Sequence, residues 1–167
     1  MEREHTCCFT GHRDLETGAL KPLQKSLKKT LQQLIQEGFS HFISGGALGF
    51  DLLAAETVLN LKKKHPHIRL IMALPCQNQD AFWNDIQKAK YRAVLSLADS
   101  IIYTAENYYK GCMFKRNRYM VDESSCVIAY LNHESGGTKY TIDYAEKSGR
   151  KIIFLHPNPH FQLSVFS

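Results

Sequence analysis

The sequence contains no long apolar run, no signal-peptide core and no C-x-x-C pair of cysteines. No stretch approaches the roughly 18 consecutive apolar residues that a membrane-spanning helix requires, and residues 1–6 lead directly into a strand pattern. The five cysteines are scattered without a C-x-x-C spacing, which favours reduced thiols over a disulfide framework or a zinc site. These absences predict a cytoplasmic protein with no membrane partner and no metal site.

Several catalytic and cofactor signatures are also missing. The sequence has no G-x-S-x-G nucleophile elbow and no plausible cysteine–histidine pair, so nucleophilic catalysis has little support. The dinucleotide fingerprint G-x-G-x-x-G is absent, which argues against NAD. The remaining acid–base candidates are His12, Asp51 and Asp143. We therefore expect no cofactor.

Length and composition predict one domain with a modest excess of positive charge. The chain has 167 residues, of which 44% are hydrophobic, as in an ordinary globular protein. We expect residues 1–156 to form a single domain and residues 157–167 to form a C-terminal extension. The formal net charge of +5 leaves nucleic acid open as a partner but does not favour it, because solvated helix faces explain the lysine clusters. A homodimer is compatible with the composition and is not shown by it.

Apolar runs alternate with helical patterns along the chain. The predicted strands are Thr6–Thr10, His41–Ser44, Arg69–Leu74, Ser100–Tyr103, Cys126–Leu131 and Lys151–Leu155. The predicted helices are Ala19–Glu37, Gly49–Lys64, Asp80–Leu97, Lys115–Glu123 and Thr138–Ser148. This alternation predicts an α/β three-layer sandwich in which helices cover both faces of a mostly parallel central sheet. Such sheets bind ligands outside the carboxyl ends of their strands, where the strand order reverses.

A glycine-rich turn separates the second predicted strand from the second predicted helix. Its candidate ligand-binding residues are Ser44, Gly45, Gly46, Gly49 and Asp51. Glycines let backbone N–H groups approach a ligand, and the N-terminus of the following helix favours an anion such as a phosphate. Asp51 can cap the helix or accept a hydrogen bond from a ribose. A turn that merely connects a strand to a helix explains the glycines equally well.

Two other loops open at the same edge of the sheet. Gly11, His12 and Arg13 follow the first strand, where a glycine allows close approach and a guanidinium can bind phosphate with two hydrogen bonds. Arg13 could instead pair with a neighbouring acid at the surface. Pro75 begins the loop after the third strand, and its position makes it a further candidate.

The last group of candidates surrounds the fifth strand. Arg116 and Asn117 begin the helix before this strand, and Gly136, Gly137 and Thr138 form a second glycine turn after it. An arginine there can hold a phosphate or ribose, while backbone N–H groups and the threonine hydroxyl can surround another phosphate oxygen. A surface ion pair is the alternative explanation for Arg116.

Aromatic residues could also wall a nucleobase by stacking. Trp83 and Tyr91 lie on the third predicted helix, and Tyr108 and Tyr109 lie in the loop after the fourth strand. At helical spacing, however, aromatic residues more often belong to the core.

Four ordered motifs resemble the YpsA-like branch of the SLOG superfamily. They are C-C-F-T-G-H-R (7–13), S-G-G-A-L-G-F-D (44–51), L-P-C-Q-N-Q (74–79) and K-R-N-R-Y-M-V-D (115–122). The resemblance covers nearly the whole chain. It implies a Rossmann-like fold, allied to the LOG phosphoribohydrolases and the DNA-processing protein DprA, and binding of nucleotides or nucleotide-derived signals. The branch is linked to cell division or stress in Gram-positive bacteria and occurs in their phages.

The sequence departs from the LOG enzymes at a catalytic position. Those enzymes carry an arginine followed by P-G-G-x-G-T-x-x-E, and the arginine and glutamate act in cleavage of an N-glycosidic bond. Arg116 matches the arginine, and Gly137 and Thr138 match the G-T pair, whereas Thr141 replaces the glutamate and the proline is missing. A threonine cannot act as a carboxylate base, which argues against the LOG reaction.

The leading hypothesis is therefore a non-catalytic protein that binds or senses a nucleotide or nucleotide derivative. One alternative is a nucleoside-phosphate N-glycoside hydrolase, in which His12, Asp51 or Asp143 replaces the missing glutamate. The other is a DprA-like nucleic-acid or protein-interaction module, which the positive charge would favour.

Overall fold

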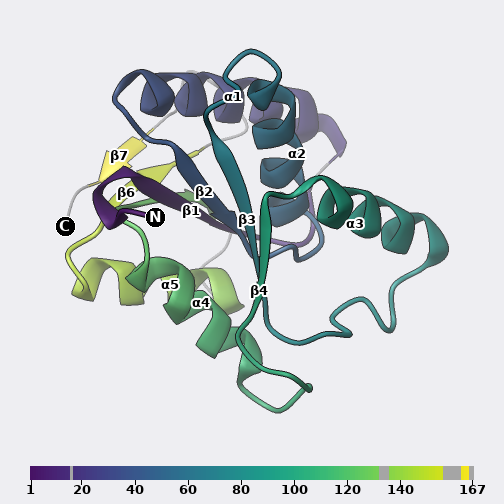
Figure 1. The fold of residues 1–167 in the computed structure, drawn as a ribbon. Helices are drawn as coiled ribbons and strands as arrows, with labels where there is room; N and C mark the ends of the chain where they lie inside the picture. Colours follow the sequence, from purple (N-terminus) through teal and green to yellow (C-terminus); the bar gives the residue numbers. More distant parts are fainter. Residues whose placement is uncertain (16, 132–135, 156–162, 166–167) are drawn as a thin grey trace.

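The centre of the molecule is a seven-stranded sheet with the strand order β4-β3-β2-β1-β5-β6-β7 (Figure 1). The structure, a computed structural model, describes residues 1–15, 17–131, 136–155 and 163–165. The strands are β1 (Thr6–Gly11), β2 (His41–Ser44), β3 (Arg69–Leu74), β4 (Ser100–Tyr103), β5 (Cys126–Tyr130), β6 (Lys151–Phe154) and β7 (Leu163–Val165). Strands β1 to β6 are parallel and β7 is antiparallel to β6, which confirms the mostly parallel sheet.

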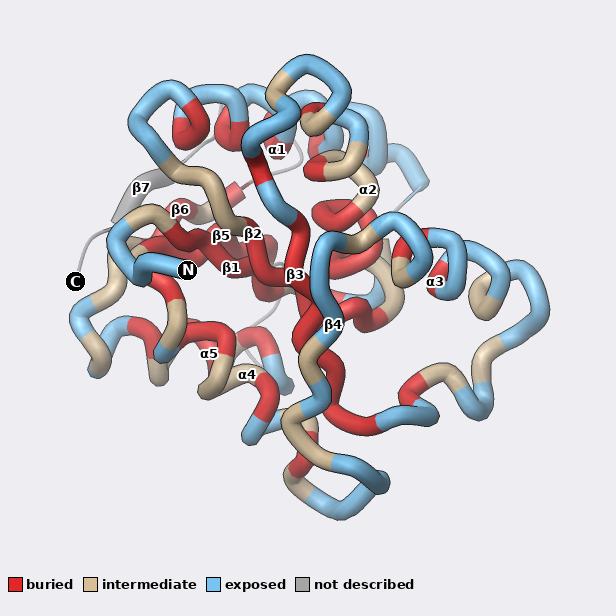
Figure 2. The backbone as a smooth tube through the Cα atoms, viewed as in Figure 1, coloured by how far each residue is buried: buried red, intermediate tan, exposed pale blue. Residues whose placement is uncertain are grey.

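Helices cover both faces of this sheet. They are α1 (Leu20–Gln36), α2 (Phe50–Lys62), α3 (Asp85–Leu97), α4 (Cys112–Asp122) and α5 (Gly136–Lys147). Helices α1 to α3 lie on one face, and α4 and α5 lie on the other (Figure 1). Side chains of β1 alternate between two hydrophobic cores, so that Phe9 joins the larger core under α1 to α3 and Cys8 joins the smaller one. Strands β1, β2, β3 and β5 are accordingly buried along most of their length, whereas the edge strand β4 is largely exposed (Figure 2).

Some element boundaries differ from those expected from the sequence. Helix α3 begins later, because the side chains of Asn84 and Gln87 form a capping box with hydrogen bonds of 2.8 and 3.1 Å. Helix α4 begins earlier, directly after Gly111, whose φ of 97° turns the chain into the helix. The short strand β7 was not predicted and lies within the segment 157–167.

The strand order reverses beside β1. From β1 the chain passes through α1 on one face of the sheet, whereas after β5 it enters α5 on the opposite face (Figure 1). The two neighbouring strands therefore direct the chain to different sides. In doubly wound sheets this is the position where ligands bind.

Gly49 fixes the junction between the glycine-rich turn and α2. Its φ is 80°, and a Cβ atom at this position would lie 2.2 Å from the main-chain oxygen of Arg13. We expect Gly49→Ala to lower the free energy of unfolding by at least about 2 kcal/mol, because backbone strain and collision with rigid main-chain atoms act together. Urea denaturation measures the change. Gly18→Ala is the matched control, since no heavy atom lies within 4 Å of a Cβ there, and equal stability of the two variants would contradict this role.

Candidate functional site

A cleft of about 500 Å³ lies at the carboxyl ends of the strands, beside β1. Five segments line it: the end of β1 with the loop after it, the turn that leads into α2, the loop before α4, the first half of α4 and the first turn of α5. The predicted site residues that line this cleft are Gly11, His12, Arg13, Asp51, Arg116, Asn117, Gly136, Gly137 and Thr138. The structure thus brings together most of the residues that the sequence placed at this edge.

The other predicted site residues lie outside the cleft. Ser44, Gly45, Gly46 and Pro75 are buried and do not line it. Gly49 lines a separate cavity of about 730 Å³ between α1, α2 and α3. The start of the glycine-rich turn therefore lies behind the wall of the cleft, to which Ala47 and Asp51 contribute.

Hydrogen bonds within the protein close this turn. The Ser44 hydroxyl donates to the main-chain oxygen of Asp51 at 2.8 Å and accepts from the Gly46 N–H at 3.2 Å. The Phe50 N–H donates to the carbonyl oxygen of His12 at 3.1 Å. Because these amides already have partners, the turn offers fewer donors to a ligand than its sequence suggested.

Gly45 leaves room for a buried arginine beneath the cleft. Arg116 is only 3% exposed, and its guanidinium donates to the carbonyl oxygens of Gly45 and Ala73 and to the Asn117 Oδ1. A Cβ atom on Gly45 would lie 2.6 Å from the Arg116 Nη1 and 2.8 Å from the Asp51 Oδ2. Opposite charges thus face each other across Gly45, and Arg116 ties α4 to the ends of β2 and β3.

Burial and mutual attraction set the ionisation of this pair. Burial raises the pKa of the Asp51 carboxyl to about 6, although the Arg116 charge and a hydrogen bond from the Ala47 backbone lower it. Burial also lowers the pKa of Arg116, an effect that the Asp51 charge opposes. Each group therefore offsets part of the free-energy cost of burying the other.

Positive charge exceeds negative charge in the cleft. Its lining includes Arg13, Lys110 and Arg116, but among the described lining residues only one carboxylate, Asp51. Arg13 and Lys110 are exposed, whereas the Arg116 guanidinium is occupied by main-chain carbonyl groups. Arg13 is consequently better placed than Arg116 to meet an incoming anion.

The first turn of α5 opens into the cleft. Gly136 and Gly137 are exposed, and no heavy atom lies within 4 Å of a Cβ built at Gly136. Helix α5 has 12 residues, and the N–H groups of its first turn have no partner inside the helix. They also carry the positive end of the helix dipole, so this turn can bind a phosphate. Ser135, which precedes Gly136 in the sequence, lies outside the described residues.

The acid–base candidates do not form a catalytic pair. The His12 ring is buried and packs edge-on against Tyr130, with ring centroids 6.5 Å apart. Asp143 does not line the cleft and accepts a hydrogen bond of 2.8 Å from the Lys139 Nζ. Thr141 is fully buried, and its hydroxyl donates to a carbonyl oxygen of its own helix. Asp51 therefore has no described partner carboxylate in the cleft.

Three exposed aromatic rings line the mouth of the cleft. Tyr108, Tyr109 and Phe114 are 67%, 45% and 41% exposed. The tandem tyrosines were noted in the sequence, but Phe114 was missed, although its place beside the predicted start of α4 was a usable signal. Trp83 packs against Tyr91 with ring centroids 5.0 Å apart and belongs to the larger core.

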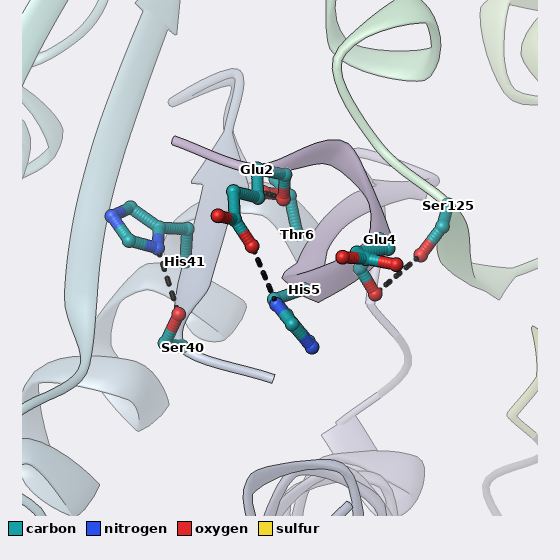
Figure 3. Close-up of polar contacts among 7 residues, drawn as sticks. All are labelled: Glu2, Glu4, His5, Thr6, Ser40, His41 and Ser125. Atoms are coloured by element: carbon teal, nitrogen blue, oxygen red, sulfur yellow. Dashed lines mark hydrogen bonds and ion pairs between the residues drawn. The ribbon is translucent and has the colours of Figure 1, made fainter. Parts of the chain in front are cut away.

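A cluster of potential metal ligands lies at the amino end of β1, away from the cleft. Glu2, Glu4 and His5 place ligand atoms within 4.8 Å of one another on an exposed turn. The His5 Nδ1 is 3.2 Å from the Glu2 Oε2, and the Ser125 hydroxyl donates to the Glu4 carbonyl oxygen (Figure 3). A second bond, from the Thr6 hydroxyl to the Glu2 carbonyl oxygen, measures 2.7 Å. These contacts explain the cluster as an anchor for the N-terminal turn.

All five cysteines are free and buried. Cys7 and Cys126 are register partners on β1 and β5, and burial raises the pKa of the Cys7 thiol, which keeps it protonated.

None of the helices in the described ranges combines the length and apolar character needed to cross a membrane.

Comparison with known families agrees with the fold and the motifs. The model of the YpsA family, described as the YspA SLOG family, matches residues 7–156. The chain belongs to the YspA SLOG family. Within that range lie all the described residues that line the cleft. The prophage-derived protein YoqJ of Bacillus subtilis strain 168 is 38% identical over 158 residues, covering 86% of this chain and 92% of YoqJ.

Solved structures extend the similarity to DNA processing protein A. The protein from Helicobacter pylori has a TM-score of 0.66 at 21% identity, covering 90% of this chain and 65% of that one. The protein from Streptococcus pneumoniae has a TM-score of 0.62 at 17% identity, covering 90% and 50%. This SLOG chain thus spans about two thirds and half of the two solved chains. The similarity confirms the Rossmann-like fold that the motifs implied.

Proposed function

We propose that this SLOG protein binds a nucleotide or nucleotide-derived anion in the cleft and does not hydrolyse it. The observation that carries the proposal is the charge of the cleft, where three cations and an open helix N-terminus meet a single described carboxylate. Its position at the reversal of strand order adds support, because doubly wound sheets bind their ligands there.

Each part of the cleft suits one part of such a ligand. In our proposal, the N–H groups of Gly137 and Thr138 hold a phosphate, and Arg13 neutralises its charge. Asn117 and Asp51 accept hydrogen bonds from ribose hydroxyls. Arg116 acts from below by fixing α4 and keeping Asp51 ionised near neutral pH.

Calorimetry with AMP, ADP-ribose and cyclic nucleotides tests this function. We expect Arg13→Gln to lower the affinity for phosphate-containing ligands about 10- to 100-fold, because a hydrogen bond to a charged group contributes ~1.5–3 kcal/mol. Arg3→Gln, an exposed arginine outside the cleft, is the matched control and should leave affinity unchanged. If no nucleotide of a broad panel binds the unaltered protein, the proposal is wrong.

The hydrolase alternative makes a separate prediction about products. Chromatography of AMP incubated with the protein would reveal free adenine if Asp51 or another group replaced the missing glutamate. We expect none, because Thr141 is buried and Asp143 lies outside the cleft. Adenine release that Asp51→Asn abolishes would show an enzyme.

A nucleic-acid function is the second candidate, and the structural similarity favours it. The H. pylori DNA processing protein A binds single-stranded DNA. If this chain does the same, affinity for an oligonucleotide should fall steeply as salt rises, since phosphate contacts release counterions. No binding even at low salt would eliminate this candidate.

Compartment and assembly complete the proposal. Five buried free thiols suit a reducing compartment, and we place the protein in the cytoplasm. A homodimer is tested by sedimentation of the full chain at several concentrations, with and without a bound nucleotide.

A further inference from the structure

The mouth of the cleft is chemically different from its floor. Five aromatic side chains are strongly exposed in the described ranges: Phe82, Tyr103, Tyr108, Tyr109 and Phe114. Three of them line this one cleft, next to the exposed Lys110. Exposed aromatic rings that line a single cavity are typical of a binding site for a flat ligand.

Backbone hydrogen bonds hold the loop that carries the two tyrosines, and the Phe114 ring packs against a neighbouring ring. The carbonyl oxygen of Tyr109 accepts a hydrogen bond of 3.0 Å from the Cys112 N–H. The carbonyl oxygen of Glu106, in the same loop, accepts one of 3.3 Å from the backbone N–H of Gln77. On α4, Phe114 packs against Tyr140 with ring centroids 4.5 Å apart. The segment between β4 and α4 projects from the edge of the sheet (Figure 1). A ligand in the cleft therefore meets a packed phenylalanine ring and two tyrosines on a loop whose backbone is hydrogen-bonded.

We propose that Tyr108, Tyr109 and Phe114 form a stacking platform for the base of the nucleotide, an inference that rests on the function proposed above. The phosphate then lies at the first turn of α5 and the base at the aromatic mouth. The cleft volume of about 500 Å³ falls within the ~300–1,000 Å³ range of small-molecule sites and accommodates both ends of one mononucleotide.

The platform defines the class of ligand. Aromatic stacking stabilises the binding of any flat ring. It therefore favours a ligand with a nucleobase but discriminates weakly between different bases. Sugar phosphates and inorganic polyphosphate lack such a ring and gain nothing from these side chains. The ligand is accordingly a base-bearing nucleotide, with purines favoured over pyrimidines because their rings are larger.

Comparing AMP with ribose 5-phosphate isolates the contribution of the base. In calorimetry we expect the unaltered protein to bind AMP about 5- to 100-fold more tightly than ribose 5-phosphate. The double variant Tyr108→Ala, Phe114→Ala should lose that advantage while its affinity for ribose 5-phosphate changes less than about twofold. Phe82→Ala, a fully exposed aromatic outside the cleft, is the matched control and should behave like the unaltered protein.

The outcomes separate the platform from the function on which it rests. Equal binding of AMP and ribose 5-phosphate by the unaltered protein overturns the platform and leaves anion binding intact. An AMP preference that survives in the double variant places the base elsewhere and also overturns it. If the double variant loses affinity for AMP and ribose 5-phosphate by the same factor, these rings only shape the cleft, and the platform is overturned. If neither ligand binds the unaltered protein, the proposed function fails and the platform fails with it. Thermal unfolding of each variant confirms that it is folded.

Discussion

Replacing Arg116 with methionine is expected to lower the free energy of unfolding by about 3–5 kcal/mol at neutral pH, the cost typical of breaking a buried charge pair. Two terms contribute to this loss. The carbonyl oxygens of Gly45 and Ala73 each lose one hydrogen-bond donor, although that of Gly45 keeps a bond from the Gln79 side chain, and Asp51 loses the opposite charge that offsets its burial. Urea denaturation of both proteins measures the difference.

A double variant separates these two terms. Adding Asp51→Asn to Arg116→Met removes the uncompensated carboxylate but does not restore the donor for the carbonyl oxygens. We therefore expect the double variant to recover part of the lost stability, so that the effects are not additive. Arg92→Met is the control, because the Arg92 side chain is 70% exposed on α3 and its ion pair should contribute little. Additive effects would show that Arg116 and Asp51 do not interact.

The second large effect concerns pH. The pKa of Asp51 is about 6 in the folded protein and near 3.8 in an unfolded chain, so the folded state holds this proton more tightly. Between about pH 4 and pH 6 the Asp51 contribution to stability should therefore fall as pH rises, by about 3 kcal/mol in total. Above that window it is constant.

The variant Asp51→Asn isolates this contribution from those of the other carboxylates. Subtracting its stability profile from that of the unaltered protein should leave a decline between pH 4 and pH 6, and a flat difference would contradict the raised pKa.

Local sequence signals predicted the sheet well. The bounds of β2, β3 and β4 coincide with the prediction, because each is a short apolar run flanked by residues that interrupt it. The helix starts were less accurate, since the capping box of Asn84 depends on a side-chain bond that several polar residues in this segment could make. Strand β7 pairs with β6 through three residue pairs, and an undescribed segment separates the two strands in the sequence. No local sequence pattern predicts this pairing.

The positions of the candidate residues in the fold were easier to predict than the contacts that these residues make. Parallel topology alone brings Arg13, Asp51 and Thr138 to one edge, and the structure places all three in the same cleft. Sequence could not show that Arg116 bonds to Gly45, because that contact depends on the packing of α4 against β2 and β3. Phe114 was missed as a lining residue, although its place beside the predicted start of α4 could have indicated it.

The reversal of strand order beside β1 places the walls of the cleft over two hydrophobic cores, one on each face of the sheet. The walls formed by α4 and α5 rest on the smaller core, whereas the turn before α2 rests on the larger one, and Arg116 links the two. One wall can therefore be redesigned, by exchange of the loop and the exposed positions of α4, with little disturbance to the packing that supports the opposite wall. In such a scaffold, ligand preference can change through substitutions in one wall while the other wall keeps its structure.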